Sequence, residues 1–221
     1  MIRWLQRVPT HAGLLIVLLI LIIVSPLVPI DRSAFILELL FDLVLLTGVH
    51  SVGPTRHRWP FLLLTVLTLG IRWGEELTGH GVLDVSALGI TTIWLVYAIS
   101  IIVGHLFQQR EVTLNTIFGA VVTYLLAGVA FGMVFQIIEL QSPGSFSGIP
   151  DSALVHRNQL TSSMMYFSLV CLTTMGYGDV VPASNLARPI AVLEGVFGQL
   201  YLAVMVARLV GLHIVHERRN D

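Results

Sequence analysis

Residues 173–179 read Thr-Thr-Met-Gly-Tyr-Gly-Asp, and a short, largely apolar segment at residues 160–172 leads directly into them. A helix over that segment would be too short to cross a bilayer, because a spanning helix needs about 20 residues. Irregular backbone at membrane depth is tolerated only where protein buries it or where it lines a water-filled path. Residues 160–179 therefore predict a re-entrant element, in which a short helix precedes an irregular segment.

The composition identifies an integral membrane protein. Of the 221 residues, 55% are hydrophobic and 11% are charged, whereas a typical soluble domain has roughly 25% charged residues. The 12 basic residues are all arginines, and with 13 acids they leave a net charge of −1, so no basic excess indicates a nucleic-acid partner. The single Cys171 excludes a disulfide framework and a cysteine-built metal cluster. No spacing of catalytic residues predicts an enzyme, and we expect no organic cofactor.

Apolar stretches flank the re-entrant element and predict an all-α membrane protein with six transmembrane helices. The third stretch is short, and it spans only if Arg58 and Arg72 reach outward or neighbouring helices shield its ends. The first could instead be a signal peptide after Arg3 and Arg7, but no small-residue cleavage site follows it, which favours a retained helix. The expected spans are residues 8–30, 33–49, 59–71, 85–107, 112–138 and 189–214.

The arginines orient the chain, because cytoplasmic loops of membrane proteins are enriched in basic residues. With the N-terminus inside, Arg32, Arg72 and Arg157 would lie on the outer side. Seven other arginines would be cytoplasmic: Arg3, Arg7, Arg56, Arg58, Arg110, Arg218 and Arg219. Both termini are therefore predicted to be cytoplasmic.

The irregular segment has the residues needed to direct backbone carbonyls at a cation. Rings of carbonyls from several chains can replace the hydration shell of a potassium ion. Consecutive carbonyls share one direction when the backbone alternates between left- and right-handed dihedrals, and Gly176 and Gly178 adopt positive φ without steric cost. Thr174 can add a hydroxyl ligand, Tyr177 is expected to point away from the axis, and Asp179 adds negative charge at the outer mouth.

Residues 173–179 resemble the selectivity filter of the tetrameric potassium channels, with Met175 in place of the usual Val or Ile. The resemblance extends to Tyr166 and Phe167, where that family often has an aromatic pair in its pore helix. It also reaches Gly198, which matches the glycine hinge of the inner helix in many members. It covers residues 111–221 as a pore domain, whereas residues 1–110 are similar to the sensor domain of six-segment channels only in number of spans and hydropathy.

The resemblance implies a homotetramer that conducts K⁺ passively through the membrane, with K⁺ bound by the carbonyls of Thr174, Met175, Gly176 and Tyr177. Gly178 completes the filter, Asp179 lies at its outer mouth, and Thr173 supports it. The small size and lack of appended domains resemble prokaryotic inner-membrane channels. Two alternatives stay open: a nonselective cation channel in which Met175 disturbs the filter, and a non-conducting regulatory subunit.

The sensor-like half lacks the arginines of voltage-gated relatives. Residues 85–107 contain none, whereas steep voltage gating needs about 3–4 charges per subunit. We therefore predict no steep voltage dependence. Glu38 and Asp42 share one face of the second span. They could pair with Arg72 or with polar groups in an outer crevice, or they could sense protons or cations.

Four further features of the pore half carry expectations. Glu194, one turn before Gly198, is expected to brace the pore helix or filter through a hydrogen bond, and direct contact with the ion is the alternative. Val170 is apolar where some relatives have a bracing Glu, so Glu194 could replace that brace. Gly128 and Gly132 suit close helix packing, either within a subunit or between subunits. His213 and His216 could form a proton or metal gate or simply be interfacial. The short tail after His216 implies that any gating ligand acts on the membrane part or through a regulatory partner.

Overall fold

The computed structural model describes residues 10–27, 30–52, 58–78, 81–109 and 111–220. Its helices are α1 (Ala12–Val24), α2 (Ile30–Val52), α3 (Arg58–Thr78), α4 (Gly81–Gln108), α5 (Leu114–Gln141), α6 (Asp151–Val155), α7 (Arg157–Leu172) and α8 (Ala187–Asn220). Two short strands, β1 (Phe146–Ser147) and β2 (Val181–Pro182), form one antiparallel pair. The prediction of a mostly helical protein is confirmed.

Four of these helices are long and apolar enough to cross a membrane: Phe35–Val52 of α2, Val85–Gln108 of α4, Leu114–Gln141 of α5 and Ala187–Leu212 of α8. The apolar α1 has 13 residues, fewer than the predicted first span, because Pro26 has no amide hydrogen to extend the helix. The polar residues of α3 keep it outside this set. Spans at α1 and α3 therefore stay predictions.

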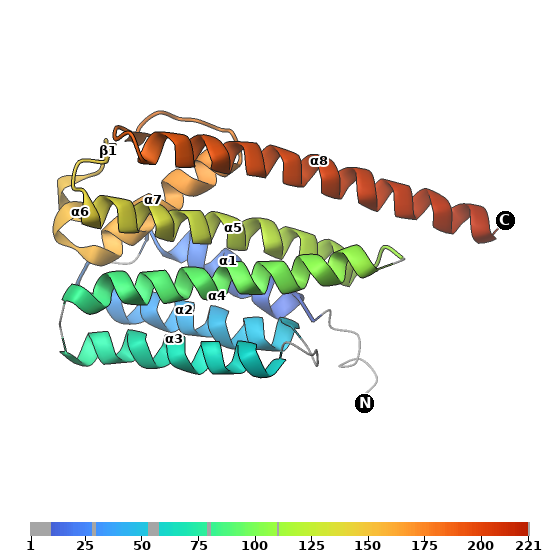
Figure 1. The fold of residues 1–221 in the computed structure, drawn as a ribbon, viewed down its shortest axis with the longest axis horizontal. Coiled ribbons are helices and arrows are strands. Elements are labelled where there is room, and N and C mark those ends of the chain that lie inside the picture. Colours follow the sequence, from blue (N-terminus) through green and yellow to red (C-terminus); the bar gives the residue numbers. More distant parts are fainter. Residues whose placement is uncertain (1–9, 28–29, 53–57, 79–80, 110, 221) are drawn as a thin grey trace.

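Helices α1 to α4 pack together as a four-helix unit against one side of α5 (Figure 1). The other side of α5 contacts α7 and α8, so α5 is the central helix of the molecule. A continuous apolar core joins α1, α2, α4 and α5, with Trp94 of α4 fully buried in it. A second core lies where α5, α7, β1 and the start of α8 meet.

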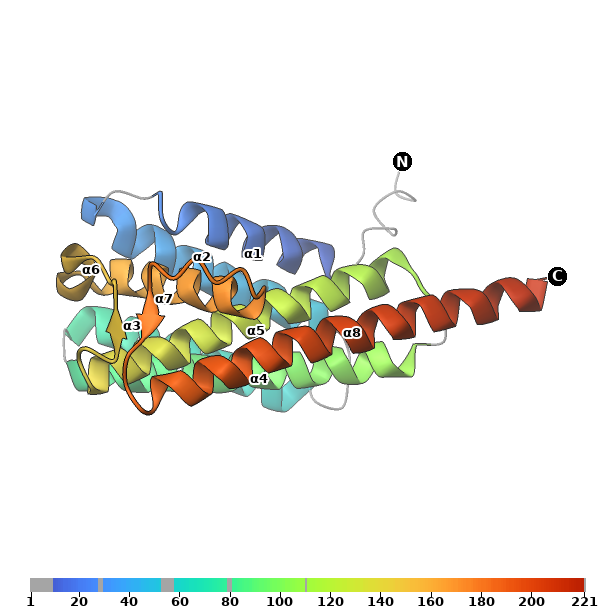
Figure 2. The ribbon, with the colours of Figure 1, turned by 90° about the horizontal axis from the view of Figure 1, so that it is seen from above.

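The expected short helix at residues 160–172 is present as α7, and it begins earlier, at Arg157. The chain then reverses and runs back along α7 to reach β2, without regular secondary structure (Figure 2). Helix α8 passes α5 and projects beyond the other helices at its C-terminal end (Figure 1). Between α5 and α7 lie β1 and α6, whose few residues give no periodic signal in the sequence.

Candidate functional site

The segment Thr173–Asp179 (the signature segment) begins where α7 ends. The Thr173 and Met175 amides still donate to the Leu169 and Val170 carbonyls, at 3.0 and 2.9 Å. These bonds satisfy carbonyls that a helix C-terminus would otherwise leave unpaired. The end of α7 is therefore rigidly joined to the first residues of the signature segment.

The backbone of the signature segment alternates in handedness. Positive φ values occur at every second residue: 58° at Thr174, 57° at Gly176 and 78° at Gly178. Thr174 is the one residue other than glycine that has positive φ in the described part of the chain. A left-handed threonine is sterically unfavourable, so the fold imposes this conformation. The expected alternation is thus present, and it includes Thr174 as well as the two glycines.

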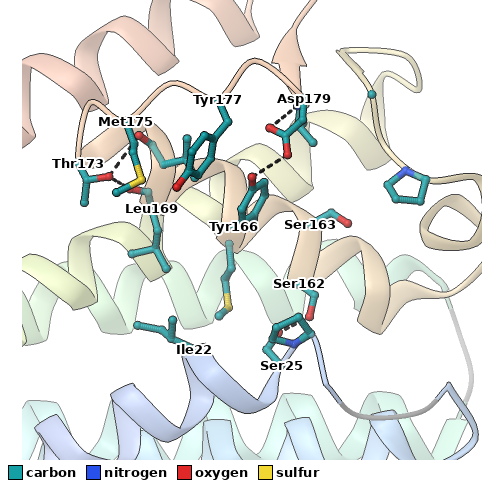
Figure 3. Close-up of a pocket in the computed structure, with 16 residues that line it drawn as sticks. Ile22, Ser25, Ser162, Ser163, Tyr166, Leu169, Thr173, Met175, Tyr177 and Asp179 are labelled. Carbon is teal, nitrogen blue, oxygen red and sulfur yellow. Dashed lines mark hydrogen bonds between the residues drawn. The ribbon is translucent and has the colours of Figure 1, made fainter.

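The side chains of Thr173, Met175, Tyr177 and Asp179 lie on the side of the segment that faces α7 (Figure 3). Met175 and Tyr177 line a cavity of about 560 Å³ between the segment, α7 and the C-terminal end of α1. At the wall formed by α1, the Ser25 hydroxyl contacts the Ser162 hydroxyl of α7. Tyr177 therefore lies on the side of the segment that faces α7, and its direction relative to a pore axis stays a prediction.

Asp179 is fixed by a residue of α7. The Tyr166 hydroxyl donates a hydrogen bond to Asp179 Oδ2 at 2.6 Å (Figure 3). This bond stabilises the ionised carboxylate and lowers the pKa of Asp179 below its ordinary value. The predicted supporting residue Tyr166 thus acts on the outer end of the signature segment.

Phe167, the other member of the aromatic pair, faces a different side of α7. It packs edge-on against Phe135 of α5 and Phe146 of β1, with ring centroids 5.1 and 5.2 Å apart. Edge-to-face pairs add about 0.5–1.5 kcal/mol beyond the burial of their surface. Phe167 therefore anchors α7 to α5, while Tyr166 holds the segment.

A hairpin that the sequence did not reveal clamps the outer end of the segment. Phe146 pairs with Pro182 and Ser147 with Val181, and the Glu139 carboxylate accepts hydrogen bonds from the Gly144 and Phe146 amides at 2.7 and 2.9 Å. Gly148 then lies directly against the Asp179 carbonyl, where a β-carbon would overlap the oxygen. This glycine is required both by its φ of 85° and by the close approach.

The inner end of the segment is held from two helices. The Tyr124 hydroxyl of α5 donates to the Leu172 carbonyl at 2.9 Å, and Gln199 of α8 donates to the Thr174 hydroxyl at 3.2 Å. Gly198 lies against the same Leu172 carbonyl, and a β-carbon there would overlap it. The structure thus gives Gly198 a packing role, and α8 is continuous through it; its role as a gating hinge stays a prediction.

Gly128 and Gly132 are both used within the subunit. A β-carbon on Gly128 would overlap the Leu169 side chain, and one on Gly132 would lie 3.0 Å from the Met165 α-carbon. Both partners belong to α7, which therefore packs closely on α5. Of the two readings of this glycine pair, the structure supports packing within a subunit.

Glu194 is fully buried and braces α7, as predicted. The Ser168 hydroxyl contacts Glu194 Oε1 and lies 2.6 Å from the Gly128 carbonyl oxygen. Ser168 therefore connects α8 to α5 through α7. Ser168, Tyr124 and Gln199 belong to no recognisable motif, so the sequence held no signal that would have singled them out.

In the four-helix unit, Arg72 of α3 pairs with both acids of α2. Its guanidinium contacts the Glu38 carboxylate, and its Nε lies 3.6 Å from Asp42 Oδ1. The Trp73 indole donates to Asp42 Oδ2 at 3.0 Å. The predicted pairing with Arg72 is confirmed, and Arg72 is buried. It lies inside α3 because the helix continues beyond residue 71.

Arg208 joins α8 to the four-helix unit, a contact that the sequence did not predict. Its guanidinium donates to the carbonyls of Leu106, Phe107 and Gln109 at 3.0, 2.8 and 3.0 Å. These carbonyls lie at the C-terminal end of α4, where a cation is favourable. His213 and His216 lie further along α8, and their side chains fall outside the described part of the structure.

Comparison with known proteins places this site in a family. The family model described as "Ion channel" matches residues 119–212. Protein LctB of Bacillus caldotenax is 30% identical over 131 residues, which cover 59% of this chain and 91% of that protein. Protein LctB of Geobacillus stearothermophilus is 29% identical over 129 residues, covering 58% of this chain and 96% of that protein. No solved structure gives a significant match. The chain therefore belongs to the ion-channel family, and it is a relative of the LctB proteins.

Proposed function

We propose that this protein is a potassium-selective channel that conducts K⁺ passively through a pore lined by the signature segment. The observation that carries the proposal is the alternating positive φ at Thr174, Gly176 and Gly178, in a chain of the ion-channel family. Such a backbone turns successive carbonyls towards one side, and rings of carbonyls are what replaces the hydration shell of K⁺. The ligands would be the carbonyls of Thr174, Met175, Gly176 and Tyr177.

One chain supplies one side of such a ring, so we propose a homotetramer with four-fold symmetry. The signature segment is exposed in the single chain, with Met175 at 59% and Tyr177 at 64% exposure. The apolar surface of α8 is also mostly uncovered. Other copies of the chain would cover both surfaces. In this arrangement α5 is the outer helix, α7 the pore helix and α8 the inner helix of a pore domain at residues 111–221.

We further propose that the four-helix unit at residues 1–110 does not drive steep voltage gating. The charge of Arg72 is paired with Glu38 and Asp42, and Val85–Gln108 of α4 contains no arginine. Moving one charge through 100 mV supplies about 2.3 kcal/mol, and steep gating needs several such charges. The chain would cross the plasma membrane six times, with both termini cytoplasmic.

Flux measurements on protein reconstituted in liposomes test the proposal. A potassium gradient should drive flux that exceeds sodium flux, and Gly178→Ala should abolish it. A β-carbon on Gly178 meets no atom within 4 Å, so this substitution acts through its φ of 78°. Gly144→Ala is the matched control, because Gly144 has φ of 85° and equally open surroundings outside the segment.

The two alternatives predict different results in the same assay. Equal fluxes of potassium and sodium, both abolished by Gly178→Ala, would indicate a nonselective cation channel. Protein that passes no ion at any membrane potential, but co-purifies with a conducting partner, would indicate a regulatory subunit. Loss of flux in Gly144→Ala as well would mean that the assay reports folding and not the pore.

A further inference from the structure

The Ser168 hydroxyl contacts two oxygen atoms that usually accept hydrogen bonds, but it has only one hydrogen to donate. Its hydroxyl oxygen lies 2.6 Å from the Gly128 carbonyl oxygen and is also in contact with Glu194 Oε1. A serine hydroxyl donates one hydrogen bond, and a carbonyl and an ionised carboxylate only accept. With an ionised Glu194, one of the two contacts would bring two acceptors together. Both become hydrogen bonds if Glu194 carries a proton and donates it to Ser168.

The surroundings of Glu194 support the same assignment. The side chain is fully buried, and among the described residues its Oε2 has no hydrogen-bond partner. The titratable groups that face it are the Tyr124 hydroxyl from α5 and the Cys171 thiol from α7, and neither supplies a positive charge. No ion pair of Glu194 is present in the described ranges, where the recorded pairs are those of Arg72. An ionised carboxylate in such a place is strongly disfavoured unless it is paired.

Glu139 provides a contrast inside the same molecule. It is almost as deeply buried, but its two carboxylate oxygens accept hydrogen bonds from the Gly144 and Phe146 amides. Backbone N–H donors stabilise the charged form of a carboxylate. Both carboxylate oxygens of Glu139 therefore have hydrogen-bond donors, whereas Glu194 contacts a hydroxyl whose hydrogen is already directed elsewhere.

We propose that Glu194 is a protonated positioning residue, which donates to Ser168 and thereby ties α8 to α7 and α5 directly behind the signature segment. The chain of bonds runs from the Glu194 carboxyl to the Ser168 hydroxyl and on to the Gly128 carbonyl. Four residues after Ser168, the Leu172 carbonyl is held by Tyr124 and lies against Gly198. Loss of the proton at alkaline pH leaves an unpaired buried charge, which loosens α7 at the base of the segment.

Infrared spectroscopy of the purified protein tests the protonation directly and does not depend on channel activity. The carbonyl stretch of a protonated carboxyl group should be present at neutral pH, absent in Glu194→Gln, and unchanged in Glu139→Gln. Glutamine preserves the hydrogen bond, because its amide also donates to Ser168. If Glu194→Gln fails to fold, Ser168→Ala should shift the same band by removing its partner. A neutral-pH spectrum without the band, or a band that survives Glu194→Gln, would overturn the protonation.

The pH profile tests the positioning role. The thermal midpoint of the wild-type protein should fall as pH rises, because the folded state holds a proton that the unfolded state releases. Glu194→Gln should flatten that fall. Potassium flux, which rests on the proposed function, should drop severalfold at alkaline pH in the wild type and stay constant in Glu194→Gln. If the flux changes with pH in the same way in both proteins, the coupling of Glu194 to the pore is wrong. If neither protein conducts, that result counts against the proposed function. The infrared spectrum and the thermal midpoints still decide whether Glu194 is protonated.

Discussion

The two halves of this protein bring their helices together in different ways. In the C-terminal half, glycines at 119, 128, 132, 148 and 198 lie so close to a neighbouring element that a β-carbon would overlap or crowd it. In the N-terminal half, glycines at 13, 70, 89 and 104 face no atom within 4 Å, and Gly48 alone in the described part of that half lies tightly against another helix, at Trp94. There, α2 and α3 are joined by Arg72 and its two acids.

This contrast has a physical meaning. Backbone contacts through glycine are closely packed, so an added carbon forces a neighbouring element to shift. A buried ion pair fixes two helices through long side chains that can adjust. The comparison therefore predicts that small added volume harms the C-terminal half, whereas loss of charge harms the N-terminal half.

The largest expected effect follows from adding one carbon beside the signature segment. Gly148→Ala should lower the free energy of unfolding by about 3–4 kcal/mol, since left-handed strain of about 1–2 kcal/mol adds to overlap with the Asp179 carbonyl. Gly144→Ala has the same φ of 85° without the overlap, and it should cost only the strain. Unfolding in mixed micelles measures both. Equal losses would show that the close approach contributes nothing.

Removing the charge of Arg72 should cost about 3 kcal/mol. Removing one partner of a buried ion pair leaves an uncompensated charge and destabilises the folded state by about 3–5 kcal/mol. We expect the low end of this range, because the Glu38 side chain is about one-third exposed and water can solvate its charge. Arg72→Gln is compared with Arg58→Gln, in which an exposed arginine of the same helix is replaced. If both variants lose a similarly small free energy of unfolding, the ion pair does not hold α2 and α3 together.

Gly198→Ala should cost about 2 kcal/mol, because the new methyl group overlaps the Leu172 carbonyl. The control is Gly195→Ala on the same helix, where the nearest heavy atom would be 3.9 Å away. That variant should gain up to about 1 kcal/mol, because alanine favours a helix more than glycine does. A neutral Gly198→Ala that nonetheless alters channel opening would favour the hinge role over the packing role.

The smallest effect concerns a single hydrogen bond at the outer end of the segment. Tyr166→Phe removes the donor to Asp179, so the pKa of that carboxyl should rise towards its ordinary value. Asp179 stays ionised to a lower pH in the wild type than in the variant. The midpoint of the Asp179 titration should therefore lie at higher pH in Tyr166→Phe than in the wild type. A site-specific isotope label on aspartate reports this midpoint. Tyr201→Phe, which loses a bond to the Ala120 carbonyl far from Asp179, should leave it unmoved.

Several parts of the site were predictable from particular residues. The glycines at 176 and 178 predicted a left-handed alternation, because glycine adopts positive φ without cost. The acids at 38 and 42 predicted a partner, since ionisable groups inside a membrane rarely stay unpaired. The brace at Glu194 was predictable from its place inside a span, together with the resemblance in which Val170 replaces a bracing Glu. The inferences from the glycines and from the two acids depend on a local property of one residue or of two residues on one helix face.

The sequence by itself determined that this is a helical membrane protein of the ion-channel kind, because apolar length and glycine spacing are local and periodic. Only the tertiary structure decided which glycines are packed and which are open, that Gly148 meets Asp179, and that Arg208 caps α4. It also decided that Ser168 connects Glu194 to Gly128. These contacts join residues far apart in the chain, and their energies depend on distances of a few tenths of an ångström that no sequence pattern specifies.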